Sequence, residues 1–161
     1  MFELGPFHSQ RTTANTWSVV GQVYTILADG PRTGGQYALV EALVPPGSGT
    51  PLHMHTREDE AFYVLEGELT VTVAGRPQLL MPGGFLHAPR GIAHQFENTG
   101  PTTARLLVWI APAGLERFFQ EVGDPLLAGA REPLPVTAER LNRLLAVAPR
   151  YGVDIYLPGA A

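Results

Sequence analysis

The sequence contains no cysteine, and all 11 of its basic residues are arginine, so lysine is absent as well. Without cysteine there are no disulfides, no thiolate metal ligands and no thiol nucleophile. Without lysine there is neither Schiff-base chemistry nor a phosphate-binding loop of the Walker type. Only three serines occur, Ser9, Ser18 and Ser48, and none lies in a Gly-x-Ser-x-Gly motif. Covalent catalysis by Ser, Cys or Lys therefore has almost nothing to work with.

The charge and hydropathy patterns argue against two further classes of protein. The formal net charge is −4, so no nucleic-acid partner is indicated. The first residues contain neither a basic n-region nor a long apolar run, and we expect no signal peptide, no membrane-spanning helix and a cytoplasmic location. With 161 residues, 45% of them hydrophobic, the chain is expected to form one domain, 1–161, around a buried core.

Glycine and proline are abundant, with 18 and 15 copies, and they separate short apolar segments over the first two thirds of the chain. Short strands between Gly/Pro-rich turns are typical of a β-sandwich or β-barrel, so we expect an all-β core over about 18–112. The predicted strands are 18–28, 36–44, 52–55, 61–65, 68–73, 85–88, 94–98 and 105–110, and 29–35 is predicted to be a loop.

The C-terminal third, about 113–161, has a different pattern. Apolar residues recur at helical spacing over 115–122, which predicts a helix. A second helix is expected over 137–148, capped by Thr137 and ended by Pro149. These helices either cover the outside of the barrel or form a lid over its mouth, and the sequence leaves both roles open.

Metal-ligating side chains are concentrated in two segments. The first contains His53, His55 and Glu60 between two glycines, and the second, 83–98, adds His94 after a Pro-x-Gly turn. Three imidazoles and one carboxylate suit a single divalent transition metal, and Fe, Mn, Ni, Co, Cu and Zn all remain candidates. Four protein ligands leave up to two positions open on an octahedral metal, which is typical of catalytic rather than structural sites.

The spacing of these residues suits strands. Side chains in a strand alternate between its two faces, so His53 and His55 point the same way. Glu60 follows after a polar stretch that suits a turn, and it can face the same interior from the next strand. His94 comes from a further strand, so only a folded β-barrel can bring all four together.

Other titratable residues near these segments carry less weight. His8 lies in a polar stretch and is expected to be solvated. His87 is expected to make a hydrogen bond within a strand, with support of a metal ligand as the second possibility. Arg57 and Arg90 flank the ligands in predicted loops, where arginine side chains are normally solvated.

The two segments resemble the cupin family. They match the patterns Gly-x5-His-x-His-x4-Glu-x6-Gly and Gly-x5-Pro-x-Gly-x2-His-x3-Asn at every fixed position. Fifteen residues, 68–82, separate the two patterns, as in small single-domain cupins. The resemblance implies a double-stranded β-helix, the jelly-roll-like cupin barrel, followed here by C-terminal α-helices. It also implies a homodimer, and a strand at 36–44 that is apolar on both faces would need cover on each side.

Period-two alternation predicts which residues share the face of the metal ligands. From Glu60 it selects Phe62 and Val64, and from His94 it selects Phe96 and Asn98. These residues either line an apolar pocket for an aromatic or other apolar small molecule or simply fill the barrel, and both interpretations remain open.

A narrower resemblance covers 60–71, 89–100 and 112–119, which are similar to small bacterial cupins of the quercetin 2,3-dioxygenase type. It implies dioxygenation of a flavonol-like or other aromatic enol by O2 at a mononuclear metal, with Glu60 as the catalytic base. Two alternatives remain, because one fold supports many functions. They are a non-enzymatic cupin that binds or senses a small molecule, and a metal-dependent isomerase or lyase for a polar substrate.

Overall fold

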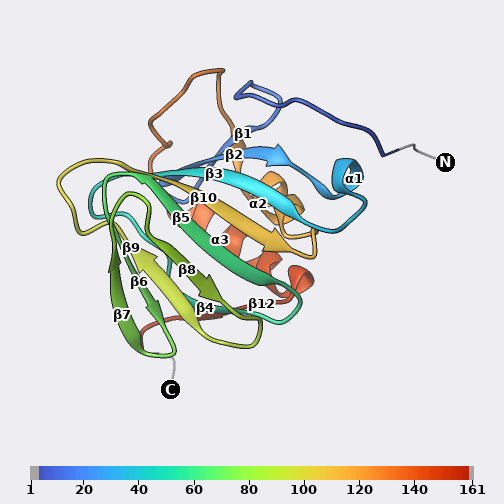
Figure 1. The fold of residues 1–161 in the computed structure, drawn as a ribbon. Helices are drawn as coiled ribbons and strands as arrows, with labels where there is room; N and C mark the ends of the chain where they lie inside the picture. Colours follow the sequence, from blue (N-terminus) through green and yellow to red (C-terminus); the bar gives the residue numbers. More distant parts are fainter. Residues whose placement is uncertain (1–3, 160–161) are drawn as a thin grey trace.

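The computed structural model describes residues 4–159 and shows two antiparallel β-sheets that face each other (Figure 1). The larger sheet has the strand order β11 (Asp124–Pro125), β1 (Thr16–Val19), β2 (Gln22–Ala28), β3 (Ala38–Val44), β10 (Ala104–Ala111), β5 (Asp59–Glu66) and β8 (Phe85–Ala88). The smaller sheet has the order β12 (Val153–Tyr156), β4 (Leu52–His55), β9 (His94–Glu97), β6 (Leu69–Val73) and β7 (Arg76–Leu80). The prediction of an all-β double-stranded β-helix with C-terminal helices is confirmed.

The core lies between the two sheets and follows from the alternation of side chains along the strands. In β10, Leu106, Val108 and Ile110 are buried, and the residues between them are partly or fully exposed. Phe62 and Leu69 enter the same core from β5 and β6.

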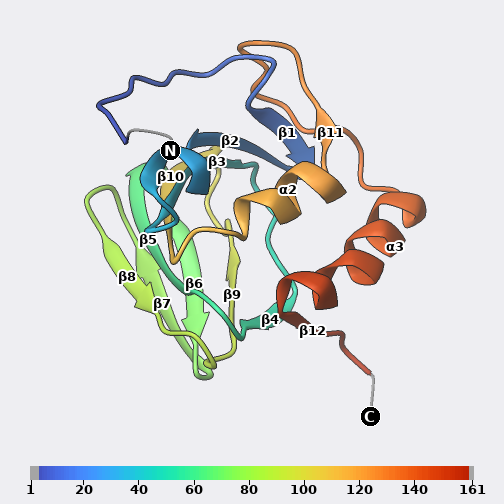
Figure 2. The same ribbon diagram turned by 90° about the vertical axis from the view of Figure 1, so that its right-hand side faces the viewer.

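The two C-terminal α-helices lie on one side of the sheets, with α2 (Glu116–Val122) beside β1 and α3 (Ala138–Val147) between β11 and β12 (Figure 2). The predicted cap of α3 is confirmed, since the Thr137 hydroxyl accepts a hydrogen bond from the Arg140 N–H at 3.2 Å. Pro149 does not end the helical segment, which continues after α3 as the 3₁₀ helix η1 (Ala148–Tyr151). None of the helices between residues 4 and 159 has the length and hydropathy needed to cross a membrane.

Two hairpin turns differ from the sequence prediction. The expected strand 18–28 is divided by a two-residue turn at Val20 and Gly21, whose φ angles are 38° and 84°. A similar turn at Ala74 and Gly75, with φ of 50° and 74°, starts the unpredicted strand β7. Both turns place a non-glycine residue at positive φ, where Asn or Gly is usual, so the sequence carries no ordinary turn signal.

Two further elements were not predicted from the sequence. The segment expected to be a loop at 29–35 contains the one-turn helix α1 (Gly30–Thr33), capped by the Asp29 side chain. The strand β12 pairs with β4 next to the predicted metal ligands, with Val153 opposite His55. Because only η1 separates β12 from α3, the C-terminal third of the chain reaches the site through both a helix and a strand.

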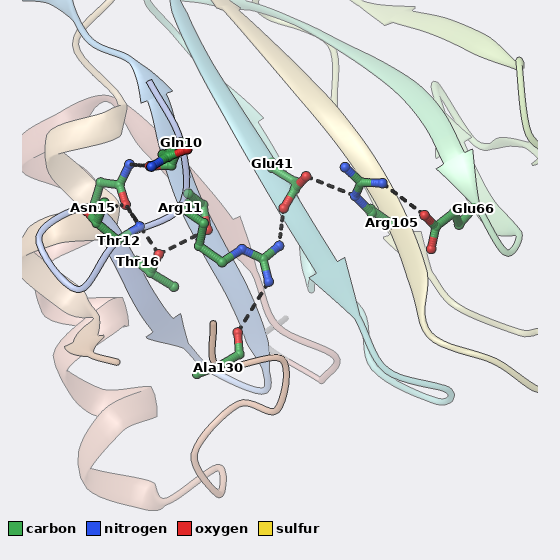
Figure 3. Close-up of polar contacts among 10 residues, drawn as sticks. Gln10, Arg11, Thr12, Asn15, Thr16, Glu41, Glu66, Arg105 and Ala130 are labelled. Carbon is green, nitrogen blue, oxygen red and sulfur yellow. Dashed lines mark hydrogen bonds and ion pairs between the residues drawn. The ribbon is translucent and has the colours of Figure 1, made fainter. Parts of the chain in front are cut away.

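A chain of ion pairs crosses the outer face of the larger sheet (Figure 3). Glu41 on β3 pairs with Arg11 and with Arg105, whose Nε lies 2.9 Å from the Glu41 Oε2. Arg105 also pairs with Glu66 at 2.9 Å, and Arg11 donates to the Ala130 carbonyl at 3.4 Å. Burial raises the pKa of Glu41, but the two guanidinium groups outweigh it and leave the pKa below its usual range.

The outer face of β2 and β3 is therefore covered by the chain itself. Val23 and Leu43 pack there against Leu126, with Ala130 and Leu134 beside them. The expectation that the strand at 36–44 needs cover on both faces is met within one chain at this end of the sheet. The outer face of β10, β5 and β8 has no such cover from residues 4–159 and exposes large aromatic side chains.

Candidate metal centre

The four predicted ligands lie together although they come from both sheets. His53 and His55 are on β4 and His94 is on β9, with His53 and His94 directly opposite each other in the strand pair. Glu60 comes from β5 of the facing sheet. One ligand atom of each residue lies within 4.8 Å of the ligand atoms of the other three. The fold therefore gathers three imidazoles and one carboxylate into one cluster between the sheets.

Backbone carbonyls orient two of the imidazoles. The His53 Nδ1 lies 2.9 Å from the Pro51 carbonyl, and the His94 Nδ1 lies 3.2 Å from the Ile92 carbonyl. A carbonyl oxygen can only accept, so each Nδ1 carries the proton and each Nε2 keeps a free lone pair. The His94 Nε2 lies 2.9 Å from the Glu60 Oε2. Two lone pairs at this distance repel each other unless a proton or a metal ion lies between them, so this pair of atoms needs one of the two.

His55 shows that the cluster fits a metal ion. It is buried, and neither of its ring nitrogens has a hydrogen-bond partner, although its Nε2 lies 3.3 Å from the Glu60 Oε2. Buried polar groups are nearly always paired, and a metal bound at the Nε2 would supply the missing partner. Three neutral imidazoles with one carboxylate are also a donor set that divalent transition metals bind well.

The electrostatics of the cluster shift the pKa values of three of its ligands in different directions. Burial raises the pKa of Glu60, but the imidazoles of His55 and His94 outweigh it and hold the pKa well below its usual range. Burial, assisted by the other two imidazoles, lowers the pKa of His53 to about 4. Burial also lowers the pKa of His55, but the Glu60 carboxylate outweighs it and leaves the pKa raised. At neutral pH the carboxylate is therefore ionised and His53 is neutral.

Glu58 is a buried carboxyl group that the sequence analysis missed. It lies in the polar stretch that suits a turn before Glu60, yet it is only 4% exposed and its Oε2 has no hydrogen-bond partner among the described residues. Burial is the main cause of its raised pKa. The neighbouring arginines behave as expected, because Arg57 is exposed and Arg90 is an exposed partner of Asp59 at 3.1 Å. His87 is exposed on β8 and has no place in the cluster.

The backbone conformation requires glycine at both ends of the first ligand-containing segment. Gly47 and Gly67 have φ angles of 74° and 72°, a conformation that other residues adopt only with strain. A side chain at Gly67 would also approach the Cα of Ala104 to 2.9 Å. These glycines let the chain turn at either end of the β4–β5 unit that carries three of the ligands.

An apolar cavity of about 90 Å³ adjoins the metal ligands. Phe62 and Phe96 line it, as the alternation predicts, but Val64 and Asn98 do not. Val64 lies two residues after Phe62 on β5 and is fully buried in the packed core. The Asn98 side chain instead holds the turn after β9, donating to the Val44 carbonyl at 2.7 Å. The alternation of side chains correctly identifies the inward face of each strand, but the cavity extends along only part of the length of the strands.

Most of the cavity wall comes from segments outside the predicted site. Apolar side chains reach it from the β1–β2 hairpin, from both helices and from β12, and Gln22 and Tyr24 add polar atoms from β2. The additional apolar residues are Val19, Val20, Val108, Phe118, Phe119, Leu141, Leu144, Val153 and Ile155. The sequence signals for them were the predicted helices at 115–122 and 137–148, which fit either a lid or ordinary packing on the outside of the barrel.

The match to known proteins covers the elements that carry the ligands. Residues 40–110 match the family described as Cupin domain, and this range contains all four ligand residues. The chain belongs to the cupin superfamily. This cupin is 34% identical over 124 residues to quercetin 2,3-dioxygenase of Bacillus subtilis, which covers 77% of the chain and 36% of that enzyme.

Two further relatives support the same assignment. Protein SchB of Streptomyces halstedii is 35% identical over 94 residues, covering 57% of this cupin and 67% of SchB. The structure of an RmlC-like cupin from Shewanella frigidimarina superimposes with a TM-score of 0.56 and 24% identity, covering 69% of this chain and 92% of that one. This cupin spans about a third of the Bacillus enzyme, so the family and the fold are shared while the activity is a separate question.

Replacing His53 by alanine should remove most of the bound metal, because it deletes one of four ligands whose orientation is already fixed. The matched control is His87→Ala, which removes an exposed imidazole from a strand outside the cluster. Elemental analysis of both purified variants after zinc loading measures the effect. Equal metal loss in the two variants would show that the ligand set is wrong.

Lowering the pH should release the metal, because a protonated imidazole cannot bind it. The pKa of His55 is raised, so this imidazole is expected to protonate first as the pH falls, whereas His53 resists protonation until about pH 4. Below the pKa of His55, affinity should fall about tenfold per pH unit for each proton that must be displaced. Equilibrium dialysis with zinc measures this, and an affinity independent of pH between about 8 and 5 would contradict it.

Proposed function

We propose that this cupin is a metal-dependent dioxygenase that acts on an apolar aromatic enol, such as a flavonol. The observation that carries the proposal is the lining of the cavity. Apart from the metal ligands, its described lining residues are apolar or uncharged, and no arginine or lysine is among them. An anionic substrate such as oxalate or a sugar phosphate would find no positively charged side chain there, so an isomerase or lyase for such a substrate is disfavoured.

The ligand residues supply the metal site and the proton acceptor that the reaction needs. His53, His55, His94 and Glu60 would hold the metal, which would supply a Lewis acid for a substrate oxyanion. Glu60 is ionised at neutral pH because the imidazoles lower its pKa, which also makes it a weak base. Proton transfer from the substrate hydroxyl to this carboxylate therefore requires that the bound metal lower the pKa of that hydroxyl as well. The apolar walls keep bulk water away from the deprotonated ring.

The size of the cavity restricts how a substrate enters. Its volume of about 90 Å³ is below the roughly 150 Å³ of an engineered cavity that holds benzene. A flavonol therefore requires part of the wall to move outward. Leu141 and Leu144 of α3 form one part of that wall, and we propose that α3 acts as the lid.

Replacing Glu60 by glutamine should reduce oxygen consumption with a flavonol by about 10²–10⁴-fold, the usual contribution of a general base. Metal content has to be measured on the same samples, because Glu60 is also a ligand. Glu66→Gln is the matched control, since Glu66 is an exposed carboxylate on the same strand.

The outcomes separate the candidate functions. Full activity with full metal content in Glu60→Gln would refute the assignment of the base. A metal-loaded wild-type protein that binds flavonols without consuming oxygen would instead support a non-enzymatic binding or sensing cupin.

We also propose that the uncovered outer face of the larger sheet binds a second copy of this chain. Tyr63, Phe85 and Trp109 are 41%, 64% and 46% exposed there, around a hollow of about 460 Å³. Exposed aromatic clusters of this kind are typical of protein interfaces. The nearby charges are already paired within the chain, Arg90 with Asp59 and Arg105 with two glutamates. A two-fold related copy would therefore meet a surface without uncompensated like charges.

A glutamate in place of Trp109 should convert the dimer to a monomer, because it buries an unpaired charge in the centre of the interface. Tyr156→Glu is the control, since Tyr156 is equally exposed, at 46%, but lies on β12 of the other sheet. Sedimentation velocity at micromolar concentration distinguishes the species. A wild-type monomer, or a Trp109→Glu variant that remains dimeric, would contradict this use of the surface.

A further inference from the structure

Away from the metal ligands, the cavity wall contains one polar pair on β2. Gln22 and Tyr24 are two residues apart, so both side chains point to the same face of the strand and both line the cavity. The Tyr24 ring is 5% exposed and stacks on Phe119 with a centroid distance of 4.6 Å. The other polar lining residue, Thr50, uses its hydroxyl oxygen to accept a hydrogen bond from the Phe96 N–H.

The direction of the hydrogen bonds in this pair is determined by the backbone. The Gln22 Nε2 lies 2.7 Å from the Gly49 carbonyl, which can only accept, so this end of the amide must be the donor. The Gln22 Oε1 is then the atom that faces the Tyr24 hydroxyl, at 2.5 Å. Tyr24 therefore donates its only proton to Gln22, and its oxygen retains acceptor capacity.

We infer that Tyr24, oriented by Gln22, is a specificity-determining residue that accepts a hydrogen bond from a second hydroxyl group of the substrate. The first substrate oxygen binds at the metal ligands, and the second hydroxyl meets the phenol oxygen in an otherwise apolar wall. The inference rests on the proposed function for the substrate class, an apolar ring that binds the metal through an enol oxygen. Tyr24 thereby selects hydroxylated members of that class over members that lack the second hydroxyl.

A purely structural role for the pair makes a different prediction. Gln22 also connects β2 to the loop at 47–51, and the Pro51 carbonyl in that loop orients His53. If Tyr24 served only to hold this loop, its replacement would weaken every ligand of the site to the same extent. Ligands that differ in one hydroxyl group therefore separate the two roles.

The test uses protein loaded with zinc, which does not change oxidation state, so that binding is measured without turnover. Allomaltol and kojic acid share the same metal-binding pyranone and differ by one hydroxyl group on the ring substituent. The second pair, 3-hydroxyflavone and 3,4′-dihydroxyflavone, extends the comparison to larger ligands. Titration calorimetry gives the affinity of each for wild type, for Tyr24→Phe and for the control Tyr37→Phe, whose ring stacks on Trp109 outside the cavity.

Wild type should bind the additionally hydroxylated member of at least one pair about tenfold more tightly, the ratio expected for one ordinary hydrogen bond. Tyr24→Phe should lose this preference and leave the affinity of the other member within about twofold, while Tyr37→Phe should keep the preference. A preference that survives in Tyr24→Phe, an equal loss for both members, the absence of any preference in wild type, or no binding of either pair would overturn the inference. Failure of the proposed function has a separate signature, namely bound flavonol without oxygen consumption.

Discussion

The burial of the Glu60 carboxylate among three imidazoles is the interaction on which the rest of the site depends. The carboxylate belongs to one sheet and the imidazoles to the other, so it joins the two layers at the same point where it forms the cluster. A buried charge without partners would cost several kcal/mol, and here His55 and His94 offset that cost electrostatically. This arrangement gathers a carboxylate and three imidazole rings in one place, as binding of a divalent metal requires.

The chemistry next to that cluster is set by segments that are far from it in the sequence. The β1–β2 hairpin, α2, α3 and β12 surround the cavity with aliphatic and aromatic side chains. Such a wall favours apolar ligands and disfavours anions, although the metal ligands alone would suit either class. In this cupin the wall restricts the class of ligand, while the metal ligands provide a chemistry that many functions can use.

The outer faces of the two ends of the larger sheet have opposite properties. At the β2–β3 end, the 126–134 segment and the ion pairs of Glu41 cover the sheet from within the chain. At the β5–β8 end, the described part of the chain leaves the outward aromatic residues exposed. An apolar strand in the sequence indicates only that both of its faces are covered, and it does not distinguish cover from the same chain and cover from a partner.

The sequence by itself determined that His53 and His55 share one face of their strand, the glycine turns around the ligands and the inward face of Phe62 and Phe96. These are local properties, because the alternation of side chains and the φ angle of a turn are decided within a few residues. It did not reveal the Val20–Gly21 and Ala74–Gly75 turns, whose non-glycine residues at positive φ carry no ordinary turn signal. Only the tertiary structure decided that Tyr24 and Leu144 share a cavity while Val64 and Asn98 are excluded from it. Such contacts join residues more than a hundred positions apart, and no local pattern encodes the distance between them.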